Sequence, residues 1–380
     1  MMKITMRNAS VYALTLGCLL FPSIGMSASL EDIDQRLKKL EGDVAANSAE
    51  TDDLTNRFKN NMSVTGYADT EYVTSSKSGD KEGFRLHHFS VFLKKQISED
   101  LRFFSETEWE DGPFHDPGAP APGGAGAIFV EAVNFDYQWR PDTNLRVGRF
   151  FTPAGIWSVD HYPPFVLTQD RPQMIRAIFP QLVDGAAVSG HHSAGKSFLN
   201  YDLYVGNGEQ KDFYGKGDYN STTAAGLRIN VALPIAQLFE VGGTVYHDKL
   251  EPNFDTSESK KDVRGVHARI RQGAVGFQAE YAKGSYKPTI NPSPAINYDS
   301  KGYYAQFSYD INKWTLGYRH DYFNPNSLTA LNGKKINSAI VNYHASKNVV
   351  LKWEHHRAKS EDQTKAGYYR DIASIVVNLD

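Results

Sequence analysis

The sequence predicts an all-β protein: a transmembrane antiparallel β-barrel of about 16 strands, preceded by a helical N-terminal segment. Three observations favour this fold. The chain opens with an apolar segment typical of secreted proteins. From residue 63 onward, apolar and polar side chains alternate along one short segment after another. The connections between these segments are alternately long and short.

Residues 1–27 are predicted to be a signal peptide. Lys3 and Arg7 precede the apolar run "VYALTLGCLLFPSIGM", and small residues follow it, which is the layout of a secretory signal. We expect cleavage near Ser27 or Ala28. As a transmembrane anchor the run would be short and interrupted by a proline, and no later apolar run reaches the roughly 18 residues of a membrane-spanning helix.

The composition of the mature chain excludes several classes of function. Cys18 is the only cysteine and lies within the signal peptide, so disulfides, thiolate metal sites and cysteine nucleophiles are not expected. Lipidation of Cys18 is disfavoured because Thr15 is a poor residue at the third position before it. Cleavage removes two basic residues, leaving 39 against 44 acidic ones. Nothing in this balance indicates a nucleic-acid partner.

Residues 28–60 are predicted to form a coiled-coil stalk, expected to lie in the periplasm. One stripe recurs at alternating steps of three and four residues: Leu30, Ile33, Leu37, Leu40, Val44, Asn47, Thr51, Leu54 and Phe58. Such a narrow stripe favours association between helices, and a single amphipathic helix packed on its own protein is the alternative. The stripe leaves open whether two or three chains meet.

The remaining residues, 61–380, are predicted to form the barrel. Segments with a period of two include "SVTGYADTEYV", "FSVFLKK", "AIFVEAVNFDYQW", "FLNYDLYVG", "AAGLRINVAL", "AVGFQAEYA", "YYAQFSYDI", "WTLGYRHDYF", "INSAIVNYHA", "VVLKWEHHR" and "DIASIVVNL". Polar clusters or turn residues bound each of them. Their spacing indicates about 16 strands up to the C-terminus.

The two faces of these strands favour a membrane barrel over a soluble sandwich. In "AAGLRINVAL", Leu227 and Ile229 share one face, whereas Arg228 and Asn230 share the other. A β-sandwich secreted into water would alternate in the same way, with its apolar face inward. The signal peptide, strands of about ten residues and aromatic residues near strand ends together favour a barrel whose apolar face meets lipid. The aromatic residues are Tyr72, Trp109, Trp139, Trp314, Tyr322, Trp353 and Tyr368.

Loop length places one irregular segment between the fifth and sixth strands. The stretch "TPAGIWSVDHYPPFVLTQDRPQMIRAIFPQLVDG" has neither helical nor strand periodicity and contains several prolines. A structureless loop of that length is uncommon and usually functional. Irregular backbone is tolerated at membrane depth where it lies in a water-filled lumen. We therefore expect residues 153–183 to fold inward as a constriction.

The chain resembles the trimeric porins of Gram-negative bacteria. The motif "VGRFFTPAG" and the N-terminal coiled coil make it similar to the phosphate-selective porin O/P-type group. The resemblance implies an outer-membrane homotrimer of 16-stranded barrels in which the loop after the fifth strand narrows the lumen. The sequence lacks a dense ladder of Arg and Lys along one wall, so phosphate selectivity is not expected.

We therefore predict a water-filled diffusion channel for small hydrophilic solutes, with a modest preference for anionic ones. Its expected partners are outer-membrane lipid and these solutes. Candidate pore-lining residues in the loop are Asp160, His161, Asp170, Arg171 and Arg176. Those expected on the inner strand faces are Arg102, Arg146, Arg228, His267, Arg269, Arg271, Arg319 and Lys352. Any of the loop residues could instead pin the loop to the wall, and a row of charges on the wall could instead be a solvated face.

The sequence shows little other chemistry. It has no nucleophile elbow, phosphate-binding glycine loop or zinc motif, so no enzyme, cofactor or metal is expected. The pairs His87-His88, His191-His192 and His355-His356 are not expected to chelate, because adjacent strand residues point to opposite faces. An outer-membrane hydrolase or a structural tether to the cell wall remains the alternative.

Overall fold

The computed structural model describes residues 38–39, 62–80, 82–111, 126–175, 177–209, 223–250, 259–288, 296–329 and 331–379. The predicted signal peptide of residues 1–27 lies outside the described residues. So does the predicted stalk of residues 28–60, except for Lys38 and Lys39, which are helical. Residues 1–60 and 61–380 form two separate units. Among the described residues, no helix is long and apolar enough to cross a membrane.

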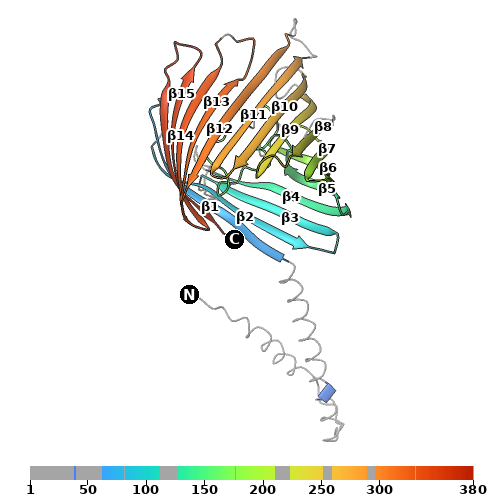
Figure 1. Cartoon of the computed structure of the whole chain (residues 1–380). Helices are drawn as coiled ribbons and strands as arrows, with labels where there is room; N and C mark the ends of the chain where they lie inside the picture. The colour runs from blue at the N-terminus through green and yellow to red at the C-terminus, as the bar shows by residue number, and fades with distance from the viewer. Residues whose placement is uncertain are drawn as a thin grey trace, which may run out of the picture. The chain divides into compact units, whose positions relative to one another are not determined.

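Sixteen strands form one closed antiparallel barrel, as predicted (Figure 1). Each strand pairs with its neighbours in sequence, and β1 closes the barrel by pairing with β16. The strands are β1 (Met62–Ser75), β2 (Gly83–Gln96), β3 (Leu101–Glu110), β4 (Ala127–Arg140), β5 (Thr143–Phe151), β6 (Leu182–Ala194), β7 (Ser197–Gly206), β8 (Ala224–Ala232), β9 (Leu238–Leu250), β10 (Ser259–Gln272), β11 (Val275–Pro288), β12 (Tyr298–Ile311), β13 (Trp314–Asn324), β14 (Lys334–Ser346), β15 (Val349–Ser360) and β16 (Tyr368–Asn378). Closure leaves no unpaired strand edge, which is what a sheet in lipid requires.

The apolar face of the barrel points outward. In β11, Phe277 and Tyr281 are both 41% exposed. Glu280 and Ala282, which precede and follow Tyr281, are buried. A soluble sandwich would bury the first pair and expose Glu280. The alternation therefore describes a wall with a lipid-compatible exterior and a more polar interior.

A β-bulge interrupts this alternation in β2. Asp69 pairs with His88 and the next residue of β1 pairs with Leu86, so His87 has no partner of its own in the ladder. The extra residue turns His87 and His88 to the same, inner face, and their ring centroids are 3.7 Å apart. The expectation that these two histidines point to opposite faces is therefore wrong. The regular strand β15 behaves as expected: His355 pairs with Asp371, whereas His356 is buried beside Glu354.

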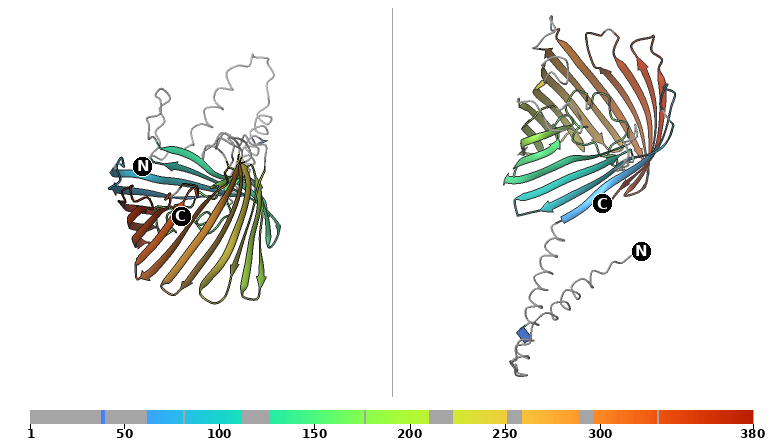
Figure 2. Two further views of the ribbon diagram at one scale, coloured as in Figure 1. Left: turned by 90° about the horizontal axis from the view of Figure 1, so that it is seen from above. Right: turned by 180° about the vertical axis from the view of Figure 1, so that it is seen from behind.

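The loop between β5 and β6, residues 152–181, lies against the inner wall of the barrel. It forms hydrogen bonds to side chains of β1, β3, β9, β11, β13, β14 and β15. A segment can reach strands around a closed barrel only from inside it. The strands enclose this segment in both views of Figure 2. We call residues 152–181 the β5–β6 loop.

An apolar core joins the β5–β6 loop to one side of the wall. Trp157, Met174 and Ile178 of the loop are each at most 3% exposed, and they belong to a cluster with Tyr204 and Tyr304 of the wall. Small wall residues make room for them. A Cβ at Gly302 would lie 2.6 Å from the Cβ of Met174, so a larger residue there would displace the loop.

Candidate functional site

Lys352 attaches the middle of the β5–β6 loop to the wall. Its Nζ donates hydrogen bonds to the carbonyl oxygens of Pro163 at 2.6 Å and Val166 at 2.7 Å, and to Oε1 of Gln169 at 3.4 Å. The residue is 3% exposed. Because a buried ammonium requires partners, these three acceptors fix the loop to β15.

Arg319 of β13 attaches the neighbouring part of the loop. Its guanidinium donates to the carbonyl oxygen of Asp170 at 2.8 Å and to Oγ1 of Thr168, and it pairs with Asp321 at 2.7 Å. Arg319 and Asp321 are each 1% exposed. The cation is therefore committed to the wall and the loop backbone.

Carboxylates of the wall accept hydrogen bonds from the loop in the same way. Oε1 of Glu280 accepts the backbone N–H of Trp157 at 2.9 Å, and Oε1 of Glu354 accepts that of Gln169 at 2.5 Å. Buried backbone donors outside regular structure need such acceptors. The wall therefore satisfies the backbone of an irregular segment that has no strand partner.

Asp170 makes an ion pair with Arg370 of β16. The guanidinium donates to both carboxylate oxygens, at 2.9 and 3.0 Å. Burial tends to raise the pKa of Asp170, but Arg370, then His356 and Arg319, outweigh it and hold the pKa below its ordinary value. Asp170 is therefore ionised at neutral pH, and its charge is directed at the wall.

Tyr162 and His161 pack where the loop meets the acidic side of the wall. The Tyr162 hydroxyl donates to Oε2 of Glu106 at 3.3 Å. Burial, followed by Glu106 and Glu131, raises the pKa of Tyr162 above its usual value, so it remains a donor. His161 is buried, with its ring 4.3 Å from that of Phe151.

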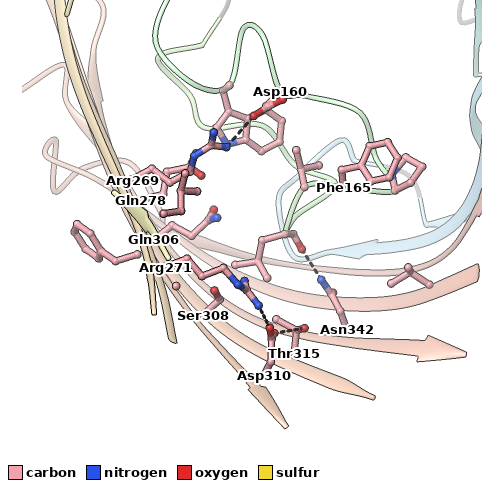
Figure 3. Close-up of a pocket in the computed structure, with 18 of the residues that line it drawn as sticks. Asp160, Phe165, Arg269, Arg271, Gln278, Gln306, Ser308, Asp310, Thr315 and Asn342 are labelled. Carbon is pink, nitrogen blue, oxygen red and sulfur yellow. Dashed lines mark hydrogen bonds and ion pairs between the residues drawn. The ribbon is translucent and has the colours of Figure 1, made fainter. Parts of the chain in front are cut away.

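A cavity lined by both polar and apolar residues remains between the loop and strands β9–β15 (Figure 3). Its volume is about 520 Å³. Arg269 donates to Asp160 of the loop at 2.8 Å and pairs with Glu240, and Arg271 pairs with Asp310. The Arg269 and Arg271 side chains are 29% and 45% exposed, so both cations keep a solvated side.

The remaining predicted residues of the wall lie away from this cavity. Arg228 donates to the carbonyl oxygen of Gly155 at 2.9 Å and so holds the start of the loop. Arg146 pairs with Asp136 on the neighbouring strand, at 2.6 Å. His267 is buried beside Asn230, and Arg102 is exposed near the turn between β2 and β3.

The last two candidate pore-lining residues of the loop are Arg171 and Arg176. Arg171 is partly exposed. It makes no ion pair within 4.0 Å with any described residue. Arg176 lies outside the described residues.

The cavity also has a neutral polar lining that was not among the predicted pore-lining residues: Gln278, Gln306, Ser308 and Asn342. All four share the inward parity of their strands, so alternation is the signal that predicts their position. The predicted pore-lining residues were all charged residues or histidines.

Charge is unevenly distributed around the inner wall. Buried acids gather on β1, β3 and β4: Asp69, Glu71, Glu106, Glu108 and Glu131. Cations gather on β8, β10, β13 and β15: Arg228, Arg269, Arg271, Arg319 and Lys352. The β5–β6 loop lies between these two groups. Carboxylates also lie among these cations, since Glu280, Asp321 and Glu354 are buried on β11, β13 and β15, so both signs of charge line that side of the wall.

Comparison with solved structures supports the fold. An anion-selective porin from Comamonas acidovorans matches 84% of this chain and 99% of its own, with a TM-score of 0.61 at 11% identity. OmpF of Salmonella typhi, in complex with daunomycin, matches 84% and 97%, with a TM-score of 0.59 at 12% identity. OmpT, an outer membrane protein of Vibrio cholerae in its trimer form, matches 83% and 98%, with a TM-score of 0.56 at 11% identity. The chain therefore has the architecture of outer-membrane porins.

Sequence comparison adds little. No known protein family matches the chain. One curated protein, an uncharacterized protein of Aquifex aeolicus (strain VF5), is 26% identical over 196 residues, which are 51% of this chain. The matched part spans 40% of that relative's length.

Proposed function

We propose that this protein is an outer-membrane porin, a water-filled diffusion channel for small hydrophilic solutes. The observation that carries the proposal is a closed 16-strand barrel with an irregular loop bonded to its inner wall and a cavity with two partly exposed arginines beside that loop. A barrel of this size has a wide lumen, and an inward element is what narrows it. In this proposal residues 153–183 form the constriction, and Asp160, Arg171, Arg269 and Arg271 meet the solute.

A modest preference for anions follows from the accessible cations. Arg319 and Lys352 are buried and committed to the loop, whereas Arg269 and Arg271 keep solvated sides. Nearby carboxylates offset much of the charge of these two arginines, so the preference should be weak. The anion selectivity of the Comamonas acidovorans porin is consistent with this sign.

A homotrimer accounts for a charged pair on the outer face. Arg149 and Asp184 are joined by two hydrogen bonds of 2.7 Å. Arg149 pairs in register with Val133, and Val133 and the neighbouring Val147 are both exposed. Charges on a lipid-facing wall are costly, so we propose that another subunit covers this face. The trimer form of Vibrio cholerae OmpT is consistent with this assembly.

The outer membrane of a Gram-negative bacterium is the proposed location, after removal of residues 1–27. The stalk of residues 28–60 would then lie in the periplasm, because the long connections are expected to be external. The similarity of the motif "VGRFFTPAG" to the phosphate-selective porin O/P-type group remains part of this proposal. Gly148 in the motif has a φ of 125°, and a Cβ there would lie 2.3 Å from the carbonyl oxygen of Val133.

Liposome swelling tests the channel and its selectivity together. Protein reconstituted from detergent should admit small anionic solutes faster than neutral and cationic ones of equal size. The double variant Arg269→Gln/Arg271→Gln should lose this preference while it still admits neutral solutes, because the accessible positive charge is removed. Arg264→Gln is the matched control, since Arg264 is exposed on the opposite face of β10. Liposomes that admit none of these solutes would contradict the proposed function.

A further inference from the structure

The bulge in β2 brings two histidines to one carboxylate on the inner wall. Nδ1 of His87 lies 3.2 Å from Oδ2 of Asp69, and Nδ1 of His88 lies 2.9 Å from Oδ1 of the same residue. Asp69 is 1% exposed. Each of these three residues offers one possible ligand atom, and the three atoms all lie within 4.8 Å of one another.

A second carboxylate faces the same place. Oε2 of Glu71 lies 3.3 Å from Nδ1 of His87. Arg85 engages the other oxygen, Oε1, whereas Oε2 is buried without a hydrogen-bond partner among the described residues. Among the described residues this oxygen has the imidazole of His87 as an ion-pair partner and no hydrogen bond, so it keeps lone pairs that a bound cation could use.

We propose that Asp69, His87 and His88, with Glu71 as a fourth ligand, form a binding site for a divalent transition-metal ion such as Zn²⁺. Neighbouring ligand atoms in a tetrahedral site with bonds of about 2.0–2.1 Å lie about 3.3 Å apart. The distances from Nδ1 of His87 to Oδ2 of Asp69 and to Oε2 of Glu71, 3.2 and 3.3 Å, are close to that value, and Nδ1 of His88 lies 2.9 Å from the other oxygen of Asp69. Two imidazoles with carboxylates favour zinc, copper or nickel over magnesium or calcium.

The two rings are 3.7 Å apart and face the same pair of carboxylates. One dication bound to both rings would place its charge beside Asp69 and Glu71 at a single point. The His87 side chain is 19% exposed, which provides a route for the ion from the lumen.

The site adjoins the β5–β6 loop. Nε2 of Gln169 donates to Oδ2 of Asp69, and Glu354 holds the backbone N–H of the same glutamine. A metal that takes an oxygen of Asp69 would therefore compete with a contact between the loop and the wall. The proposal stands apart from the channel function, because binding is measured on the protein in detergent.

Calorimetric titration with Zn²⁺ tests the site on protein purified without a histidine tag. The wild type should bind one ion per chain. His87→Ala and His88→Ala should each weaken binding at least about 100-fold, since each removes a ligand. The double variant His191→Ala/His192→Ala is the matched control. It removes an adjacent, exposed histidine pair at the end of β6 and should bind as the wild type does.

A spectroscopic measurement separates ligation from loss of structure. Cu²⁺ bound to the wild type should show paramagnetic resonance coupling to two imidazole nitrogens, and His88→Ala should show one. Asp69→Asn preserves shape and the hydrogen bond from Gln169, so it should fold and still lose affinity. Wild-type affinity in both His87→Ala and His88→Ala, or no stoichiometric binding by the wild type, would overturn the proposal.

Discussion

At the residue scale, the inner cations differ in how much of their charge stays accessible to solvent. Lys352 and Arg319 are buried and bond to loop carbonyls, whereas Arg269 and Arg271 are partly exposed in the cavity, although Arg269 also pairs with Asp160 of the loop. Sequence parity predicted that all four share the inner face. Alternation along a strand predicts which face a side chain lies on, but not which loop atom it contacts. The β5–β6 loop has no regular period, so its contacts with the wall cannot be predicted from the sequence.

Asp170 provides a prediction about pH. Its folded pKa lies below the ordinary 3.8, so its ion pair with Arg370 stabilises the loop above that value. This stabilisation is lost as the pH falls through the depressed pKa. Wild-type single-channel conductance should therefore be steady from neutral pH down to about 4 and should change only below it.

Asp170→Asn should show the altered conductance already at pH 7, because it removes the charge and leaves the size. We expect a loss of about 1 kcal/mol of loop anchoring, since both partners are partly exposed. Asp362→Asn is the control: Asp362 also has a lowered pKa, but its partners lie in the β15–β16 connection. Wild-type conductance in Asp170→Asn, with the acid transition retained, would show that Asp170 does not anchor the loop.

At the scale of elements, the inner and outer faces of the regular strands agree with the alternation in the sequence, whereas the prediction for His87 and His88 of the bulged strand β2 is wrong. In β2, Phe84 and Leu86 point outward, and so do Phe89 and Val91. The outward positions change from even to odd across His87. This change in the alternation of apolar residues is present in the sequence and indicates a bulge. It can be recognised only by comparing the apolar positions before His87 with those after His88.

The β5–β6 loop shows what an element-scale pattern can and cannot give. Its length sets it apart from the other connections between strands. Its apolar side chains, such as Trp157 and Met174, pack against the wall where the wall residues are small, at alanines and glycines. Such pairing joins residues more than 100 positions apart, so a single sequence carries no local signal for it.

Shortening the β5–β6 loop should raise single-channel conductance severalfold and abolish solute preference, because the barrel wall alone would then limit passage. Replacing residues 158–175 by a short glycine-serine linker keeps Trp157, Ile178 and Phe179 on the wall, which favours folding. Shortening the β13–β14 connection at residues 325–329 is the control and should leave conductance unchanged. Wild-type conductance after the first change would mean that the loop does not narrow the pore.

At the scale of the whole molecule, the barrel was predictable because lipid reverses the usual burial pattern. Val147, Phe277 and Ile375 are exposed, whereas Glu108, Arg319 and Glu354 are buried. The strands show this arrangement through alternation, and the predicted signal peptide favours a membrane barrel over a soluble sandwich. Strand count and closure follow from the same pattern. The coiled coil of residues 28–60 stays a prediction from its heptads.

The stalk gives a prediction about assembly. A heptad stripe buries apolar surface only when helices associate, so deletion of residues 28–60 behind an intact signal peptide should weaken the oligomer or slow its formation. Single-channel conductance should stay nearly unchanged, because the barrel strands and the β5–β6 loop are retained. Cross-linking and native electrophoresis of detergent extracts would measure the first effect, and planar-bilayer recordings the second. Replacing Lys38 and Lys39, which are exposed and lie outside the heptad stripe, by Gln is the matched control. An unaltered oligomer with altered conductance would show that the stalk belongs to the pore and that the heptads serve a contact within one chain.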